Sequence, residues 1–350
     1  MRILYAGQLA SYDSAWYRVL ALRREGHEVF SLNALDYGQK NALLRKIEYR
    51  MVKGPEVNRL NRDLLAQAQQ LRPDVVWADK LLFMQPATLE QLRRMGIVTV
   101  SYMIDNFFGP RRDPGWRLYA KTIPYYDLHC TQRDVNITDY RNAGARDVIK
   151  IQTAYEPTIH FAPPEGWSDR DRDRDVSFVG TPYDQRPEFL TRLAKEGGVS
   201  VAVNGGLVWK PALERVGGDA LYRGNGELRN DDYREAIWRS RINLSFLTHS
   251  NQDEFVHKSF EITACGGFLL AERSAGHAAR FVEDEEAVFF TGLEECIAKV
   301  QKYLHDEPAR TRIAHAGWQR ALSSGYDNDT QVRHIVERLE PLVRKMRGTA

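Results

Sequence analysis

The sequence has few cysteines and no long hydrophobic run. Three cysteines (Cys130, Cys265 and Cys296) are too few and too widely spaced for a disulfide framework or a zinc-binding cluster. No apolar run approaches the length of a membrane span, and the apolar run that follows Met1 and Arg2 is too short for a signal-peptide core. These absences argue against a disulfide-stabilised secreted domain and a membrane-spanning protein, and we expect a cytoplasmic location.

A strong excess of charge is also missing. The 49 Lys and Arg residues nearly balance the 47 Asp and Glu residues, and the formal charge of +2 is too small to indicate nucleic acid as the main partner. The charge is unevenly distributed, because residues 1–165 are net basic and the remainder is net acidic. The first half is therefore the half more suited to an anionic surface.

Two familiar phosphate-binding patterns are absent. There is no G-x-x-x-x-G-K-[ST] motif, and no G-x-G-x-x-G follows the first expected strand, which argues against a P-loop enzyme and weakens a dehydrogenase. Asp-x-Asp pairs occur at 169–175 and 327–329, but neither follows a core strand. We interpret them as solvated charges and expect neither a metal ion nor another cofactor.

The chain is 43% apolar and 27% charged, and its sequence pattern predicts alternating strands and helices. The first half predicts strands at 2–6, 27–32, 74–78, 97–104, 126–131 and 148–152, a helix at 14–25 and a long helical region at 39–72. The second predicts strands at 176–179, 199–203, 220–223, 242–246 and 287–290, with helices at 186–196, 231–240, 294–305, 308–323 and 330–346. Residues 156–175 are expected to form an extended, solvated linker.

This order predicts an α/β protein with two doubly wound parallel-sheet domains. We place the first domain at residues 1–165, the second at 176–330, and a C-terminal helix at 331–350 that returns to the first domain. Binding sites are expected in the loops at the carboxyl ends of the strands.

The most informative stretch is HKSFEITACGGFLLAE at 257–272. It predicts a short helix that ends at Gly266 and Gly267, because a residue with positive φ is not strained when it lacks a Cβ. The apolar run from Phe268 to Ala271 then predicts a strand buried on both faces.

Residues 257–268 resemble the C-terminal domain of GT-B glycosyltransferases of the group 1 type, in particular the CgeB-like (spore maturation protein CgeB-like) subgroup. The similarity continues in VSFVG at 176–180, INLSF at 242–246 and ARFVEDEEAVFF at 279–290, and in the first half in VTVSYMIDN at 98–106. It covers nearly the whole chain. The resemblance implies a GT-B fold and a transferase of polysaccharide biosynthesis that uses a nucleotide-sugar such as a UDP-sugar.

The resemblance also implies roles for residues of the second domain. Glu261 stands five residues before Gly266, the spacing at which the family holds the donor ribose, although an i,i+3 surface pair of Lys258 and Glu261 is the alternative. Lys258 and Arg186 are candidates for the diphosphate, where a cation stabilises the leaving group without a metal. Asp253 replaces the family's Glu, so contact with the donor sugar is left open between Asp253, Glu254, His257 and none of them.

The remaining candidates lie in loops. Gly205 and Gly224 follow strands where relatives contact the nucleotide base, and ordinary tight turns explain them equally well. Asp105 ends a strand and would orient or deprotonate the acceptor hydroxyl, or simply cap a helix. Asp105 and Lys258 are our candidate catalytic residues. The cleft loops of the first domain would contain Gly7, Gln8 and Lys80.

A basic region at 40–62 fits a peripheral contact with the inner face of a membrane, and a solvated face is the simpler explanation. The apolar residues of this region are expected to pack inward in either case: Leu43, Leu44, Ile47, Met51 and Val52.

The sequence as a whole predicts a metal-independent glycosyltransferase, with an acceptor that is a glycan, a lipid-linked molecule or a protein. Relatives of this type are usually retaining. A nucleotide-sugar 2-epimerase and a non-catalytic GT-B partner subunit are the alternatives, and the oligomeric state is left open.

Overall fold

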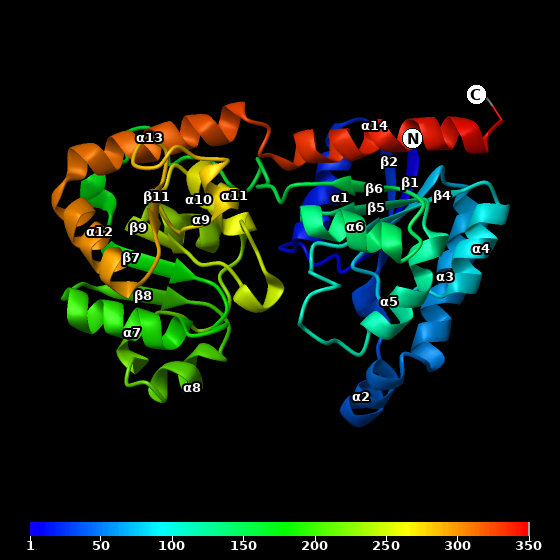
Figure 1. The fold of residues 1–350 in the computed structure, drawn as a ribbon, viewed down its shortest axis with the longest axis horizontal. Helices are drawn as coiled ribbons and strands as arrows, with labels where there is room; N and C mark the ends of the chain where they lie inside the picture. The colour runs from blue at the N-terminus through cyan, green and yellow to red at the C-terminus, as the bar shows by residue number, and fades with distance from the viewer. Residues whose placement is uncertain (349–350) are drawn as a thin grey trace. The chain divides into compact units, whose positions relative to one another are not determined.

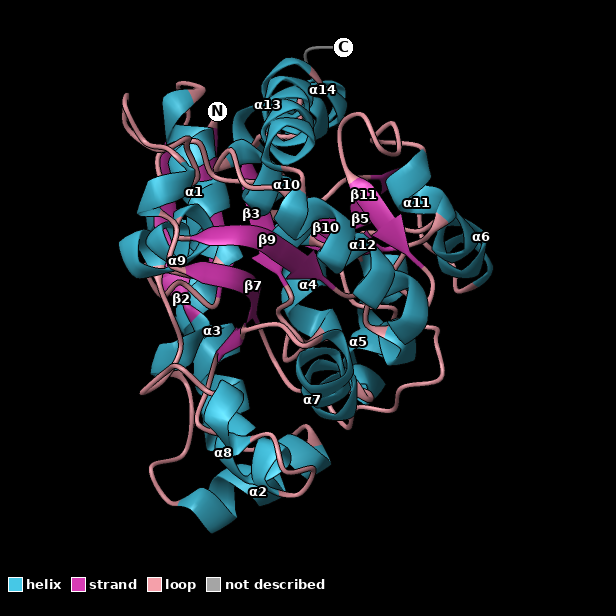
Figure 2. Ribbon diagram, turned by 90° about the vertical axis from the view of Figure 1, so that its left-hand side faces the viewer, coloured by secondary structure: helices cyan, strands magenta, loops and turns pink. Residues whose placement is uncertain are grey.

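The computed structural model describes residues 1–348 and divides into two α/β units. Unit 1 contains residues 1–153 together with 328–348, and unit 2 contains residues 154–327. Each unit is built on one parallel sheet, and the strands are shown in magenta in Figure 2. Two parallel-sheet α/β units confirm the fold class predicted from the alternating pattern.

Unit 1 has a six-stranded sheet in the order β2-β1-β3-β4-β5-β6. Its strands are β1 (Arg2–Gly7), β2 (Glu28–Asn33), β3 (Val75–Asp79), β4 (Val98–Tyr102), β5 (Leu128–Thr131) and β6 (Val148–Lys150). Its helices are α1 (Ser14–Arg24), α2 (Ala42–Met51), α3 (Pro55–Leu71), α4 (Pro86–Arg94), α5 (Trp116–Thr122), α6 (Asp134–Asn142) and α14 (Asn328–Met346), with 3-10 turns at Ala34–Asp36 and Ile123–Tyr125.

The sheet of unit 1 is buried on both faces. Ile3 and Tyr5 of β1 point into one core, while Leu4 and Ala6 point into the other, as the two-residue period of a strand requires. Helices α1 and α14 cover the first face and helices α3 and α4 the second (Figure 1). This double burial explains why the strands read as short, continuous apolar runs.

Helix α14 belongs to unit 1 although it follows all of unit 2 in the chain. It packs along α1, and ion pairs join Arg24 to Asp329 at 2.6 Å and Arg333 to Glu25 at 2.7 Å. The predicted return of the C-terminal helix to the first domain is therefore confirmed.

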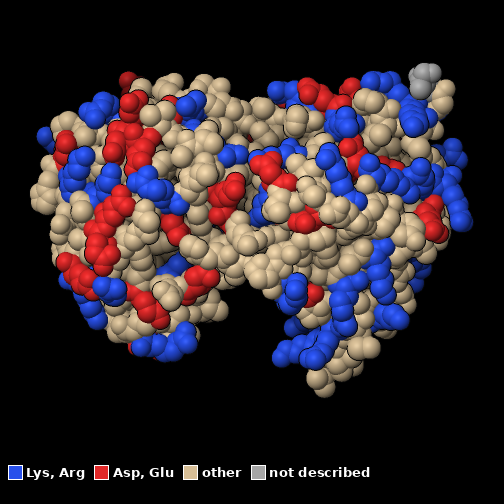
Figure 3. Space-filling view, viewed as in Figure 1, with Lys and Arg blue, Asp and Glu red and all other residues tan. Residues whose placement is uncertain are grey.

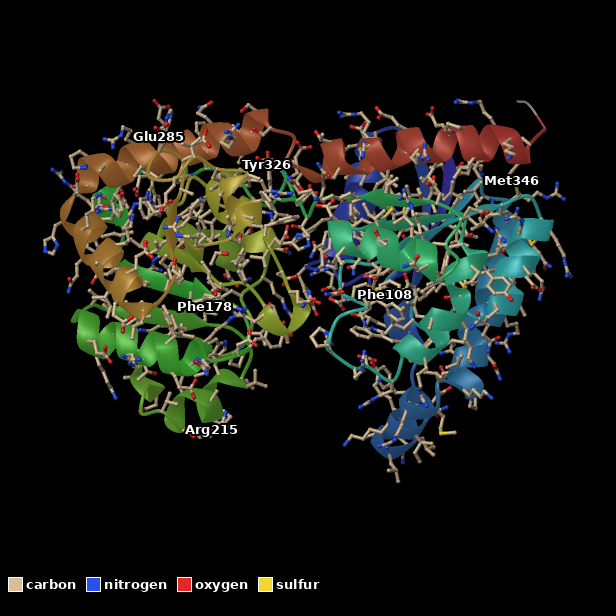
Figure 4. All side chains as sticks on the ribbon, viewed as in Figure 1. Phe108, Phe178, Arg215, Glu285, Tyr326 and Met346 are labelled. Atoms are coloured by element: carbon tan, nitrogen blue, oxygen red, sulfur yellow. The ribbon has the colours of Figure 1, made fainter. Side chains whose placement is uncertain are left out.

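Unit 2 has a five-stranded parallel sheet in the order β11-β10-β9-β7-β8. Its strands are β7 (Arg174–Val179), β8 (Val201–Asn204), β9 (Ser240–Ser245), β10 (Leu269–Glu272) and β11 (Val288–Phe290). Its helices are α7 (Arg186–Gly197), α8 (Trp209–Glu214), α9 (Asn230–Trp238), α10 (His257–Ala264), α11 (Ala275–Ala278), α12 (Leu293–His305) and α13 (Glu307–Ser323), with 3-10 turns at Asp169–Asp171, Asp219–Leu221 and His249–Asn251. Phe178, which is labelled in Figure 4, belongs to the core on one face of this sheet.

The prediction that the apolar residues of region 40–62 pack inward is wrong for four of them. The region is two helices, α2 and α3, because Val52 has a positive φ of 49° and Gly54–Pro55 starts a new helix. The exposed fractions are 66% for Leu43, 51% for Leu44, 49% for Ile47 and 58% for Met51, and Val52 is partly buried. The buried residue of α2 is instead Glu48.

The predicted solvated linker at 156–175 is also wrong in its second half. Asp169 accepts hydrogen bonds from Arg310 at 2.6 Å and Arg241 at 3.2 Å, and Asp173 pairs with Arg239. Strand β7 begins at Arg174, so these aspartates are part of the ordered unit. Their partners lie 66–141 residues away in the chain, which composition cannot reveal.

The strand predicted at 220–223 is reduced to a single bridge between Val203 and Tyr222. A 3-10 turn at Asp219–Leu221 occupies most of that stretch.

Candidate functional site

The carboxyl ends of β7 and β8 in unit 2 are held close together by glycines. A Cβ on Gly205 would lie 2.1 Å from the carbonyl oxygen of Gly180, so only glycine fits at this position. Trp209 donates from its indole Nε1 to the same Gly180 carbonyl at 2.7 Å, and the Tyr222 hydroxyl donates to the Gly205 carbonyl at 2.9 Å. The two loops therefore form one tightly joined surface. Gly224 follows Tyr222 and extends it.

Lys258 lies in the first turn of α10, against the end of β7. A Cβ on Gly180 would be 3.1 Å from Lys258 Cε, which places the lysine stem directly beside that strand end. Its Nζ lies 5.4 Å from the centre of the Tyr233 ring, and within residues 1–348 it has no ion-pair partner within 4.0 Å. Burial lowers the pKa of this ammonium. The result is a half-buried cation that is available to an anionic ligand.

Glu261 lies one helical turn after Lys258 and is also half-buried. The Tyr233 hydroxyl donates to Glu261 Oε2 at 2.6 Å. Burial acts to raise the pKa of the carboxyl group, but His160, Lys258 and His257 together lower it below its ordinary value. Glu261 is thus held as a carboxylate, the form that accepts hydrogen bonds from hydroxyl groups.

The two glycines that end α10 have different functions. Gly266 has a φ of +67°, which a Cβ would strain, whereas Gly267 is required by packing. A Cβ on Gly267 would lie 2.7 Å from Ile237 Cγ2 and 3.1 Å from the carbonyl oxygen of Ile262. The pair ends the helix and lets β10 start at once, so α10 is fixed closely to the sheet.

Arg186, predicted to bind the diphosphate, is largely occupied by the protein itself. Its guanidinium donates to the carbonyl oxygens of Thr181 at 3.0 Å and Leu247 at 2.9 Å, and the side chain is buried among Phe178, Tyr183 and Phe246. It joins the loop after β7 to the loop after β9. Its charge also contributes to the lowered pKa of Lys258.

Asp253 and His257 lie on the segment between β9 and α10. Asp253 accepts a hydrogen bond from the Asn251 amide at 2.8 Å, and its charge acts on Arg186. His257 Nδ1 lies 3.1 Å from the carbonyl oxygen of Ala154, and its charge acts on Glu261. Glu254 is exposed, and its backbone carbonyl accepts from Ser274. Electrostatic interactions thus link Arg186, Asp253, His257, Lys258 and Glu261 within unit 2.

Unit 1 contains a cavity of about 780 Å³ at the ends of its strands. Three predicted residues line it, Gln8, Lys80 and Asp105, and Lys80 Nζ pairs with Asp105 Oδ2 at 2.9 Å. Gly7 is not part of the lining; a Cβ there would lie 3.1 Å from Asp79. The cavity walls also carry aromatic and charged side chains that sequence reasoning missed: Arg18, Tyr37, Tyr49, Asp79, Phe83, Arg111, Asp113 and Trp116.

A buried ion pair forms part of the lining of this cavity. Arg18 of α1 contacts Asp79 Oδ2 at 2.6 Å, both side chains are almost fully buried, and Tyr5 donates its hydroxyl to the same carboxylate. The Arg18 guanidinium lies 4.1 Å from the centre of the Tyr102 ring. No spacing rule connects residues 18 and 79, so the sequence held no signal for this pair. In unit 2, Tyr233 and His160 were missed for the same reason.

The described residues hold neither a candidate metal cluster nor a candidate membrane span. Within residues 1–348, no three His, Cys, Asp or Glu side chains gather closely enough to hold a metal ion. Each helix in the same range is too short or too polar to span a bilayer.

Comparison with known proteins gives one family match, which covers most of unit 2 and the first part of α14. Residues 185–337 match a family model described as glycosyl transferase-like, which spans less than half of the chain. No curated protein matches the chain.

Solved structures match over nearly the full length at low identity. The sucrose-phosphate synthase of Thermosynechococcus elongatus is 10% identical with a TM-score of 0.72, and the match covers 97% of this chain and 99% of that one. HepE of Anabaena in complex with UDP-glucose is 14% identical with a TM-score of 0.69, covering 97% and 100%. A putative UDP-N-acetylglucosamine 2-epimerase from Listeria monocytogenes is 9% identical with a TM-score of 0.61, covering 98% and 97%.

These likenesses define the class of the protein by its fold. The two parallel-sheet units have the GT-B architecture. At identities of 9–14% they carry no residue-by-residue assignment.

Proposed function

We propose that this protein is a metal-independent glycosyltransferase that takes its sugar from a nucleotide-sugar. The observation that carries the proposal is that Lys258 and Glu261 lie one turn apart on α10, beside the glycine-lined ends of β7 and β8. The match of residues 185–337 to a glycosyl transferase-like model supports it, as does the likeness to HepE, whose solved structure is a complex with UDP-glucose. A uridine nucleotide is the first donor to test.

Unit 2 would bind the donor through two complementary contacts. The Glu261 carboxylate accepts hydrogen bonds from the two ribose hydroxyls, and the Lys258 ammonium faces the diphosphate. When the bond from the sugar C1 to the phosphate oxygen breaks, negative charge grows on the diphosphate, and a nearby cation stabilises it. Arg186 would act through its two loops, because its guanidinium already donates to backbone carbonyls. Gly205 and Gly224 would let the base approach the backbone.

Unit 1 would bind the acceptor in its cavity. Asp105, held by Lys80, would orient the attacking hydroxyl. If the reaction is retaining, the leaving phosphate takes the acceptor proton, and Asp105 acts only in positioning; if it is inverting, Asp105 is the base. We also propose that the protein belongs to the CgeB-like subgroup. Its acceptor would be a glycan, a lipid-linked molecule or a protein.

A nucleoside diphosphate should raise the melting temperature. Ligand at a hundredfold excess over its dissociation constant stabilises the folded state by about 2.7 kcal/mol. A thermal-shift screen of the nucleoside diphosphates UDP, GDP, TDP and ADP, with the monophosphate CMP included, measures this. Failure of every nucleotide would contradict the proposal.

A 2-epimerase is the second candidate, because one similar structure is that of a putative UDP-N-acetylglucosamine 2-epimerase. The two activities differ in what they need. An epimerase changes the configuration of the sugar in the nucleotide-sugar when no acceptor is present. A transferase incubated with the donor alone does not produce that epimer. Chromatography of the donor after incubation with the protein alone distinguishes them.

A further inference from the structure

Helix α2 carries an apolar stripe that no other described element of unit 1 covers. The stripe consists of Leu43, Leu44, Ile47 and Met51, with exposed fractions between 49% and 66%. Successive helical residues are turned by about 100°, so these four side chains share one side of the helix. Outside α2, the exposed large apolar side chains of the described part of unit 1 lie singly on different segments: Leu35, Met95 and Val135.

The other faces of α2 are used by the fold. The Glu48 carboxylate accepts hydrogen bonds from the backbone N–H groups of Glu56 at 2.8 Å and Val57 at 3.0 Å, which caps the start of α3. Tyr49 packs edge-on against Phe83 at 5.7 Å, and its hydroxyl donates to Asp113. These contacts fix the rotation of the helix. The apolar stripe is therefore held facing away from unit 1.

Exposed basic residues lie on α2 and beyond its two ends: Lys40, Arg45, Lys46, Arg50 and Lys53. Lys46 and Arg50 lie next to the stripe on the helix surface, whereas Lys40 and Arg45 line the cavity. None of the five has an ion-pair partner within 4.0 Å in the described chain, whereas several other arginines of unit 1 do. The one acid between residues 40 and 53 is Glu48, which is buried. Figure 3 shows blue and tan surface over the end of unit 1 that carries α2. The exposed charge of this segment is therefore uniformly positive.

From this arrangement we infer that α2 docks on an anionic lipid surface, with the stripe inserted at the boundary between headgroups and acyl chains. An apolar face flanked by lysine and arginine is the pattern of a helix that lies in a membrane interface. Nucleic acid would satisfy the cations but leave four apolar side chains in water. A purely apolar partner would leave five cations without counter-charges.

Docking also has a consequence for unit 1. Arg45, Glu48 and Tyr49 of α2 line the cavity, so α2 separates that cavity from the lipid surface by about one helix diameter, roughly 10 Å. The inference does not depend on the proposed function, because lipid binding is measured without any nucleotide-sugar.

The test is sedimentation of the full-length protein with vesicles. Vesicles of phosphatidylcholine and phosphatidylglycerol in equal parts should bind the protein, vesicles of phosphatidylcholine alone should bind it much less, and raised salt should release it. Two double variants, Leu43→Gln/Ile47→Gln and Lys46→Gln/Arg50→Gln, should each weaken binding by about tenfold or more.

Matched controls remove similar groups elsewhere. Val282→Gln/Leu322→Gln changes two apolar side chains with exposed fractions of 43% and 48%, and Arg94→Gln/Lys121→Gln changes two exposed cations of unit 1. Both should bind vesicles like the original protein, and circular dichroism should show every variant folded. No binding to the mixed vesicles, or equal loss in variants and controls, overturns the inference. So does a dimer in sedimentation velocity that the Leu43→Gln/Ile47→Gln change dissociates while vesicle binding is absent.

Discussion

Glu261 is the residue whose surroundings say most about its use. Its half-buried carboxylate accepts a hydrogen bond from the Tyr233 hydroxyl. Burial acts to raise the pKa of this carboxyl group, but the nearby basic groups have the larger effect, so the pKa is lowered. Glu261→Ala should weaken nucleotide affinity about 10- to 100-fold, since hydrogen bonds to charged groups contribute about 1.5–3 kcal/mol. Isothermal titration with the nucleotide found by the thermal-shift screen measures it. Glu235→Ala, which removes an exposed carboxylate of α9, is the control, and equal affinity in both variants would remove the ribose assignment.

Asp79 illustrates a residue that serves stability. It is buried against Arg18, so removing it leaves an unpaired cation in the interior. Asp79→Ala should lower the free energy of unfolding by about 3–5 kcal/mol. Urea denaturation measures this, and Glu196→Ala, which breaks an exposed pair with Arg192, should barely change it. An equal decrease in the free energy of unfolding in the two variants would show that the buried pair contributes no more to stability than the exposed pair.

These residues differ in how far the sequence predicted them. Lys258 and Glu261 lie in one contiguous stretch, so their spacing on a short helix can be read directly from the sequence. Arg18 and Asp79, or Glu261 and Tyr233, meet only when distant elements pack. Arg186 was found by position, but its partners were not, because backbone carbonyls leave no trace in the sequence.

At the scale of elements, the joined loops after β7 and β8 should tolerate no side chain at Gly205. A Cβ there would meet the Gly180 carbonyl at 2.1 Å, and two backbones would have to move apart. Gly205→Ala should therefore lower the melting temperature and weaken nucleotide binding. Gly198→Ala is the matched control, with a φ of +63° and open space around it, so its cost is about 1–2 kcal/mol from the backbone alone. If Gly205→Ala leaves the nucleotide affinity unchanged, the loop after β8 is not part of the donor-binding site.

Helix α2 shows what periodicity leaves undetermined. The spacing of Leu43, Ile47 and Met51 correctly places them on one face, because helical geometry is local. Whether that face has a partner depends on tertiary contacts, here the capping of α3 by Glu48. The same limit explains the linker aspartates, whose arginine partners lie far along the chain.

At the scale of the whole molecule, the order of strands and helices was enough to predict two parallel sheets. A parallel connection needs a crossover helix, so alternation along the chain largely fixes the architecture. The strand order within each sheet and the burial of particular polar residues are properties of the assembled units, and sequence patterns do not specify them.

Each unit buries a histidine deep in its core, and this predicts how the molecule responds to acid. Burial lowers the pKa of His129 in unit 1 and of His277 in unit 2 to about 4. His129 Nε2 lies 2.9 Å from the Ile123 carbonyl oxygen, and His277 Nε2 lies 2.7 Å from Ser259 Oγ. Both imidazoles are therefore neutral in the folded protein at neutral pH.

An unfolded histidine has a pKa near 6.5, so between about pH 6.5 and pH 4 the unfolded chain binds more protons than the folded one. The stability that the two histidines contribute is complete above about pH 6.5 and is lost as the pH falls through this window, by up to about 3 kcal/mol for each. Urea midpoints measured from about pH 7.5 down to about pH 5 should therefore fall steadily. His277→Gln should flatten the fall, and the same change at exposed His305 should leave it as it was. A midpoint independent of pH over this range would show that neither buried imidazole resists protonation.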